Sequence, residues 1–283
     1  MTNKTIAVVT GASRGAGKGI AIALGTTGAT VYVTGRSVSG KESAVGGSIA
    51  ETAAAVDAAG GKGIAVPVDH ADDATVAALF KRATNEHGRL DILVNNAAKL
   101  VASVHLGPFW KQSIEEADVI TVGLRSHYVS SYHATPLLIA NGKGLIVNTG
   151  FYGAVSYFYG PTYGAQKAGE DKMAADMAKE LRPYNVSVNS IWMGRLDTER
   201  ARVNLASQAE GSGAQYHRES PQFTGRVIAA LYASPERMIL SGRALIGAEL
   251  AIKFGITDID GRQPPSYRDT LGAPPELHPS LLG

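Results

Sequence analysis

The sequence predicts a single α/β domain, in which a doubly wound parallel sheet of about seven strands lies between two layers of helices. Short apolar, β-branched runs alternate with longer helical patterns along the chain, as expected for parallel strands joined by crossover helices. No internal repeat or linker divides the 283 residues, and a hydrophobic content of 45% is ample for one large core. We expect residues 1–257 to form this domain and the Pro-rich residues 258–283 to pack on it as an irregular tail.

The expected elements follow from where the apolar runs and the helical patterns fall. The apolar runs predict strands at residues 6–9, 30–34, 63–68, 92–95, 144–148 and 186–191, with a weaker one at 244–246. Helical patterns between them predict helices at residues 17–24, 49–59, 74–87, 114–138 and 163–181. Residues 37–48, which are rich in Ser and Gly, are expected to form a long flexible connection after the second strand.

Composition favours a small molecule as the partner of this protein. The net charge is only +2 and the basic residues are scattered, so we expect no nucleic-acid partner. No cysteine is present, which excludes disulfides and thiolate metal sites, and His105, His127 and His133 are too scattered to suggest a metal site. The first strand begins too early for a signal peptide, and no run reaches the roughly 18 apolar residues that span a membrane. We therefore expect a cytoplasmic protein with no membrane partner.

A glycine-rich turn joins the first strand to the first helix and predicts a phosphate site. Without side chains the backbone can approach a diphosphate, and the free N–H groups and positive dipole end of the helix favour an anion. We expect this turn to contact a dinucleotide cofactor through Gly11, Ser13, Arg14, Gly15, Ala16 and Gly17. A plain tight turn is the alternative interpretation of the same glycines.

The end of the second strand favours NADP(H) over NAD(H), which stays the second choice. An acidic residue there would bind both ribose hydroxyls, but this chain has Arg36 instead. Arg36 and Arg14 together could bind a 2′-phosphate; alternatively, Arg36 is a solvated surface residue. Asp69, at the end of the third strand, suits either the adenine amino group or the cap of the helix that begins near Asp72.

Three motifs in order give the chain a family resemblance. Gly11, Gly15 and Gly17 match TGxxxGxG, residues 95–97 match NNAG with Ala98 in place of its last glycine, and Tyr163 and Lys167 match YxxxK. Over about residues 5–200 the chain therefore resembles the short-chain dehydrogenase/reductase (SDR) family, and segments 122–128 and 255–262 resemble one branch of it. The resemblance implies a Rossmann-type fold and hydride transfer with a nicotinamide cofactor.

The resemblance also implies roles for single residues. Tyr163 and Lys167 are four residues apart at a helix start, so they share one face, and the lysine charge can lower the phenol pKa for proton transfer. Lys167 would also bind the nicotinamide ribose, and Thr198 the carboxamide. Asn95 and Ala97, at the end of the fourth strand, are expected beside the cofactor.

Two positions depart from the family pattern. Gly150 stands where the family has the serine that polarises the substrate carbonyl, and Gly123 replaces an asparagine that supports a proton relay. Thr149 is the candidate replacement for the serine, but its side chain points the right way only if the strand end is bulged or has turned. The following loop offers further hydroxyl groups, from Tyr152, Ser156, Tyr157 and Tyr159.

These observations lead to two hypotheses for the function. The first is an NADP(H)-dependent oxidoreductase that acts on a carbonyl or alcohol, with Tyr163 as acid and base; Phe109, Trp110 and Tyr216 in the expected substrate segments 99–112 and 195–222 favour a fairly apolar substrate. The alternative, which Gly150 motivates, is a dinucleotide-binding protein that has lost efficient catalysis and acts as a sensor or assembly partner. The resemblance implies a homodimer or homotetramer through the helices near residues 114–138 and 163–181.

Overall fold

Seven parallel strands form one sheet in the computed structural model, which describes residues 4–41, 45–99, 107–206 and 218–281. Their order is β3-β2-β1-β4-β5-β6-β7, and every adjacent pair is parallel. The strands are β1 (Ile6–Val9), β2 (Thr30–Gly35), β3 (Lys62–Pro67), β4 (Ile92–Asn95), β5 (Gly144–Gly150), β6 (Val186–Trp192) and β7 (Ala244–Ile246). The predicted seven-stranded doubly wound sheet is confirmed.

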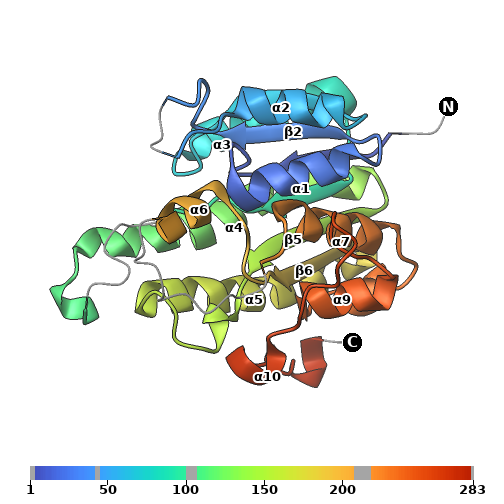
Figure 1. Ribbon diagram of the computed structural model, residues 1–283. Coiled ribbons are helices and arrows are strands. Elements are labelled where there is room, and N and C mark those ends of the chain that lie inside the picture. Colours follow the sequence, from blue (N-terminus) through green and yellow to red (C-terminus); the bar gives the residue numbers. More distant parts are fainter. Residues whose placement is uncertain (1–3, 42–44, 100–106, 207–217, 282–283) are drawn as a thin grey trace.

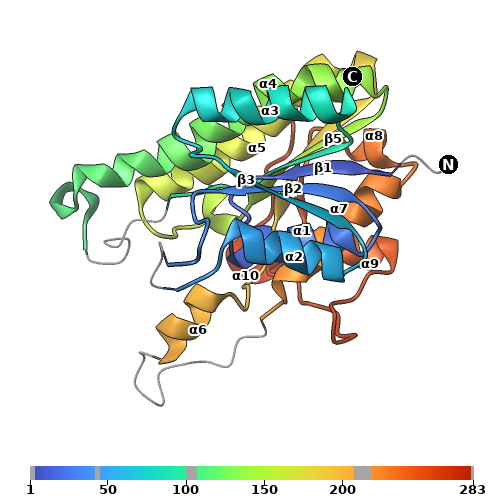
Figure 2. The same ribbon diagram turned by 90° about the horizontal axis from the view of Figure 1, so that it is seen from above.

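Helices cover both faces of the sheet, so the fold has three layers (Figure 1, Figure 2). One face carries α1 (Gly15–Gly25), α2 (Ile49–Ala58), α7 (Pro221–Ala233) and α9 (Gly247–Phe254), and the other carries α3 (Asp73–His87), α4 (Ser126–Ala140) and α5 (Pro161–Leu181). Each layer has its own apolar core, around Leu24 and Phe223 on the first face and around Phe80 and Ile146 on the second. Burying apolar side chains on both faces explains why the strands are continuously hydrophobic.

The strand order reverses between β2 and β4, which are both neighbours of β1. Because ligands of open α/β sheets bind in the crevice at such a reversal, beyond the carboxyl ends of the strands, this edge is where a site is expected. The α1 and α7 helices pack closely beside it. A Cβ on Gly225 would lie 2.7 Å from the Cα of Ile20, so the glycine permits this approach.

The prediction of one continuous helix over residues 114–138 is wrong. The chain forms a 3₁₀ turn, η2 (Ile114–Ala117), then a wide turn, η3 (Ile120–Arg125), and only then the regular helix α4. The break lies at Val122 and Gly123, where Gly123 has a φ of +157°, a conformation that other residues rarely adopt. The apolar pattern could not reveal this break, because the pattern continues across Val122 and Gly123.

Three of the longer helices were not predicted from the sequence. These are α7, α9 and α6 (Glu199–Ala206), whose patterns are short or interrupted by glycine. Two shorter helices are α8 (Arg237–Leu240) and α10 (Arg268–Leu271), and the remaining 3₁₀ turns are η1 (Phe109–Lys111), η4 (Tyr152–Ala154), η5 (Arg182–Tyr184) and η6 (Pro279–Leu281).

The Pro-rich tail, described from residue 258 to 281, runs against the sheet domain. The backbone N–H of Tyr267 donates to the hydroxyl of Tyr152 at 3.0 Å, and Arg268 forms an ion pair with Glu249 of α9 at 2.6 Å. Ser156 donates to a backbone carbonyl of α10. Across the described parts of the chain, no helix is both long and apolar enough to cross a membrane.

Candidate active site

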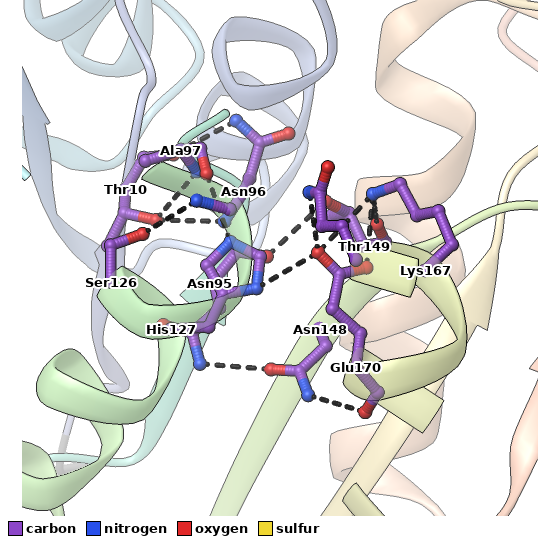
Figure 3. A network of polar contacts seen from close by, with 12 residues as sticks. Thr10, Asn95, Asn96, Ala97, Ser126, His127, Asn148, Thr149, Lys167 and Glu170 are labelled. Carbon is purple, nitrogen blue, oxygen red and sulfur yellow. Dashed lines mark hydrogen bonds and ion pairs between the residues drawn. The ribbon is translucent and has the colours of Figure 1, made fainter. Parts of the chain in front are cut away.

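The glycine turn after β1 is locked to the end of β4. The Thr10 hydroxyl accepts the backbone N–H groups of Asn96 at 2.8 Å and Ala97 at 3.0 Å, and the Asn96 amide donates to the Thr10 carbonyl at 2.9 Å (Figure 3). A Cβ on Gly11 would lie 2.7 Å from the Cα of Ala97, and one on Gly17 would overlap the Asn96 amide. Both positions require glycine, because the turn and the residues after β4 approach each other too closely for a side chain.

The first turn of α1 presents an anion-binding end. Gly11 and Gly15 have φ values of +63° and +57°, and the N-cap residue Arg14 makes no side-chain capping bond. Instead, the Gly15 N–H donates to the carboxylate of Glu199 on α6 at 2.9 Å. The turn therefore binds negatively charged oxygen, which is the chemistry that a diphosphate offers. Ser13 is buried beneath this turn and Ala16 is half-buried within it.

Positive charge gathers at the carboxyl end of β2. Arg14 donates to the Ser37 hydroxyl at 2.7 Å and to the carbonyls of Gly46 and Gly47 at 2.6 and 3.2 Å, so it ties the connection after β2 to the glycine turn. Arg36, next to Ser37, is exposed. No acidic side chain lies between the end of β2 and Ser37 to bind ribose hydroxyls.

Asp69 follows β3 near this edge. Its carboxylate accepts the N–H of Ala71 at 3.0 Å in a local turn, whereas the cap of α3 is Asp72, which accepts the N–H of Ala74 at 2.9 Å. The helix-cap interpretation of Asp69 is therefore wrong, because α3 begins at Asp73 and its N-cap is Asp72, three residues after Asp69. The half-buried Asp69 stays next to the proposed adenine end of the site.

The YxxxK pair lies on the first turns of α5. The Nζ of Lys167 donates to the carbonyl of Thr149 at 2.8 Å and lies 5.7 Å from the centroid of the Tyr163 ring. Contrary to the direction expected from the sequence, the pKa of Tyr163 is raised, by burial first and then by the negative charge of Glu170. Lys167 is held by Thr149 and Glu170 rather than by the phenol.

Sequence reasoning missed a buried cluster behind Lys167. Glu170 is fully buried with Oε2 3.0 Å from the lysine Nζ, and its Oε1 accepts from the Gln166 amide at 3.0 Å. His127 of α4, which the sequence suggested was an ordinary packing or surface residue, lies 3.3 Å from the same Oε1. An acidic residue three positions after the lysine was the one available signal, since i and i+3 side chains share a helix face.

The side chains of Thr149 and Asn95 are buried and hydrogen-bonded to neighbouring elements of the fold. β5 stays regular to its end, with Thr149 opposite Ile191 and Gly150 opposite Trp192, so the bulge that Thr149 would need is not present. The Thr149 hydroxyl donates to the Asn95 carbonyl at 3.3 Å, and the Asn95 amide donates to Ser131 and Asn148 at 3.0 Å each. Both residues fix the frame of the site, and Thr149 reaches Lys167 through its carbonyl.

Gly150 has no room for a side chain. A Cβ at this position would overlap the Ser190 hydroxyl and lie 2.6 Å from a ring carbon of Trp192, both on the neighbouring strand β6. The indole N–H of Trp192 is in turn held by Asp171 of α5 at 3.0 Å. The packing of β5 against β6 therefore requires a glycine at this position.

Of the four loop hydroxyls, one lies against the candidate catalytic tyrosine. Tyr152 and Ser156 bind the C-terminal tail, and Tyr157 is 85% exposed. The ring of Tyr159 packs edge-on against Tyr163 with centroids 5.1 Å apart, and its φ of +54° is uncommon for a residue other than glycine.

The remaining candidate residues are Thr198 and those of the expected substrate segments 99–112 and 195–222. The Thr198 hydroxyl accepts the N–H of Ala201 at the start of α6, and its methyl would lie 3.6 Å from a Cβ on Gly15, so it borders the glycine turn. Phe109 and Trp110 are exposed. Residues 100–106 and 207–217, with His105 and Tyr216, lie outside the described part of the chain.

The sequence is similar to a known family and to proteins that belong to it. Residues 5–209 match the family described as short chain dehydrogenase. The chain is 36% identical to dehydrogenase/reductase SDR family member 1 of Mus musculus, over 93% of this chain and 85% of that protein. It is 34% identical to 3-oxoacyl-[acyl-carrier-protein] reductase FabG of Pseudomonas aeruginosa, over 72% and 79%.

A solved structure supports the fold in the same way. The chain superposes with a TM-score of 0.76 and 26% identity on a "putative dehydrogenase" from Xanthomonas campestris, over 92% of this chain and 93% of that one. The predicted family, and the branch predicted from segments 122–128 and 255–262, are confirmed. The chain belongs to the short-chain dehydrogenase family, whose members are oxidoreductases that use an NAD(P) cofactor and small-molecule substrates.

Proposed function

We propose that this protein transfers a hydride between NADP(H) and a carbonyl or alcohol substrate. The observation that carries the proposal is the Tyr163 and Lys167 pair on α5, at the carboxyl edge of the sheet that also holds the glycine turn. The nicotinamide supplies the hydride to a carbonyl carbon, or accepts it from an alcohol, when the cofactor is bound. Tyr163 gives the proton to the substrate oxygen, or takes it back in the reverse direction.

The residues present fit a dinucleotide. The glycine turn already binds a carboxylate through the Gly15 N–H, and the glycines at positions 11 and 17 let the turn pack closely against the end of β4, which brings the start of α1 to this edge of the sheet. Asn95 and Ala97 shape the floor, and Thr198 borders the turn on the nicotinamide side. Lys167, whose Nζ lies between the Thr149 carbonyl and Glu170, would hold the ribose.

The preference for NADP(H) rests on charge. Arg36 is exposed beside Ser37, which Arg14 contacts, so two guanidinium groups lie at the strand end where a 2′-phosphate would bind. One charge-assisted hydrogen bond contributes about 1.5–3 kcal/mol, which favours NADPH over NADH by about ten- to a hundredfold. Asp69 is the proposed contact of the adenine amino group.

Tyr159 is the proposed replacement for the missing serine. It lies against Tyr163, and the strained backbone at Tyr159 indicates that packing holds the ring there. Its hydroxyl can polarise the substrate oxygen while Tyr163 protonates it. A relative named as a reductase of a 3-oxoacyl group supports a carbonyl compound as the substrate class.

The experiment follows NADPH absorbance with a panel of aldehydes, ketones and quinones, using wild type and Tyr163→Phe side by side. We expect oxidation by wild type that is lost in Tyr163→Phe, because the proton donor is removed while the ring stays. Binding of NADPH by both proteins without oxidation by either favours the alternative, a dinucleotide-binding protein that acts as a sensor or assembly partner. Light scattering on the same samples tests the proposed homodimer or homotetramer.

A further inference from the structure

Glu170 connects Lys167 to a second buried titratable group. It is fully buried on α5, and its two carboxylate oxygens face different partners (Figure 3). Oε2 lies 3.0 Å from the Nζ of Lys167, and Oε1 lies 3.3 Å from Nδ1 of His127. The hydride-transfer chemistry proposed above uses neither Glu170 nor His127.

The contacts of His127 determine which of its nitrogens carries a proton. Its Nε2 lies 3.0 Å from the Ala97 carbonyl, which can only accept, so Nε2 carries the hydrogen. Burial first, and the positive charge of Lys167 second, lower the pKa of His127 to about 3, so the ring is neutral and Nδ1 keeps its lone pair. Nδ1 is buried and makes no hydrogen bond with the described residues. Two acceptors that face each other at 3.3 Å repel unless a proton lies between them.

Glu170 is the group whose surroundings favour that proton. Burial raises the pKa of Glu170 to about 7, although the charge of Lys167 and the hydrogen bonds from Lys167 and Gln166 act in the opposite direction. The nearby carboxylate of Asp171 raises the Glu170 pKa further. Protonated Glu170 can donate to Nδ1 of His127, which removes the repulsion.

Besides Lys167 and Asp171, two further titratable groups nearby, His70 and Tyr163, are neutral. Burial lowers the pKa of His70, which follows β3 and acts electrostatically on His127, to about 4. The negative charge of Glu170 adds to burial in raising the pKa of Tyr163, so the phenol keeps its proton. From β5, the uncharged amide of Asn148 donates to the backbone carbonyl of Glu170 at 3.1 Å.

The same cluster fills the place of the absent asparagine. A Cβ on Gly123 would overlap the Gln166 amide, so the Gln166 side chain occupies that space and donates to Glu170 at 3.0 Å. The chain therefore has a built polar site behind Lys167, in which Gln166 fills the space beside Gly123 and connects it to the acid.

We propose that Glu170 and His127 share one exchangeable proton at neutral pH, and that this pair resupplies Lys167 with a proton after each turnover. The inference rests on the proposed function, in which the hydride and the Tyr163 proton convert C=O to CH–OH. Lys167 then returns a proton to the tyrosinate and takes the proton of Glu170, which becomes a carboxylate. Glu170 recovers a proton from solvent before the next turnover, so the balance is one solvent proton per alcohol formed. Glu170 is thus a positioning residue that acts through Lys167.

The first test is an NMR titration of the protein without substrate. In protein labelled with ¹³C-glutamate, with Glu170 assigned by its loss in Glu170→Gln, we expect the carboxyl carbon to titrate near 7. Histidine ¹⁵N shifts should show His127 neutral with Nε2 protonated. His127→Phe removes the acceptor of the Glu170 proton, so the midpoint of the Glu170 titration should fall by about one pH unit. A Glu170 carboxyl that is ionised at every pH above 5, or a charged His127, overturns the proposal.

The second test separates the proton supply from the proposed function. Glu170→Gln keeps the shape but cannot release a proton, so kcat should fall about 10- to 100-fold and lose its pH dependence near neutrality, with the Kd for NADPH unchanged. The matched control is Glu180→Gln, at an exposed position on the same helix. An unchanged kcat and pH profile in Glu170→Gln overturns the inference.

The two failures can be told apart. Turnover that Tyr163→Phe abolishes, with Glu170 ionised throughout, keeps the proposed function and overturns the inference. If Glu170 and His127 share a proton but the protein turns over no substrate, the proposed function is overturned, and so is the role of the pair in supplying protons to Lys167. If Glu170→Gln does not fold by circular dichroism, the wild-type titration and His127→Phe decide.

Discussion

Removing the carboxylate of Glu199 should tighten the binding of NADPH. This carboxylate accepts the Gly15 N–H at 2.9 Å and lies 3.8 Å from the Nζ of Lys18, so it occupies the anion-binding end of α1. A bound diphosphate must displace it or accept its negative charge as a neighbour.

The magnitude follows from the exposure of these groups. A hydrogen bond to a charged group contributes about 1.5–3 kcal/mol when protected from water. The side chain of Glu199 is 34% exposed and that of Lys18 32%, so solvent screening reduces the bond, and the ion pair adds little. We expect a net effect of about 1 kcal/mol, or about fivefold in Kd.

The assay is a titration of NADPH fluorescence at low salt with wild type and Glu199→Gln. The Kd should fall about fivefold in Glu199→Gln, and the difference should shrink in ~1 M salt, where the Debye length is ~3 Å. Glu236→Gln, which removes a surface ion pair with Lys253, is the control and should leave the Kd unchanged. A Kd that stays the same or rises in Glu199→Gln refutes the reasoning, because Glu199 would then not compete with the cofactor.

Three further predictions concern Tyr159, Gly150 and the buried Glu219. Tyr159→Phe should lower kcat/KM about 100-fold, measured by steady-state kinetics with any substrate found. Tyr157→Phe, at an exposed position, should leave kcat/KM unchanged. Equal kcat/KM values for the two variants would exclude Tyr159 as the polarising group. Gly150→Ser should lower the midpoint of thermal unfolding without raising kcat, because the new side chain collides with β6; a gain in turnover would contradict this. Burial raises the pKa of Glu219 in the folded protein to about 8, so the folded state favours the protonated carboxyl. Its contribution to the free energy of unfolding is therefore complete below the pKa of the unfolded chain and is lost as pH rises through about 8. Urea unfolding should show the free energy falling from pH 6.5 to 8.5, and Glu219→Gln should flatten that fall; an equal slope in both proteins would count against it.

The fold was predictable from the sequence because its signals are local. The apolar runs at β1, β4 and β7 matched the strand bounds at both ends, and the glycine turn was found from its place between a strand and a helix. Errors arose where backbone geometry departs from periodicity. At Gly123 the apolar pattern runs on through a break, and the capping residue of α3 is Asp72 rather than Asp69.

The catalytic surroundings were harder to predict because burial is not a local property. Glu170 follows Lys167 by three residues, and from the sequence it could equally have faced water. Only packing against α4, which brings His127 within 3.3 Å of Glu170, buries the carboxylate. The two glycines, Gly150 and Gly123, likewise have to be assessed together with what fills the space beside them. At Gly150 the neighbouring strand fills it with Ser190 and Trp192, and at Gly123 the Gln166 side chain fills it and reaches an acid. A larger residue at either position would thus overlap side chains that are already packed there.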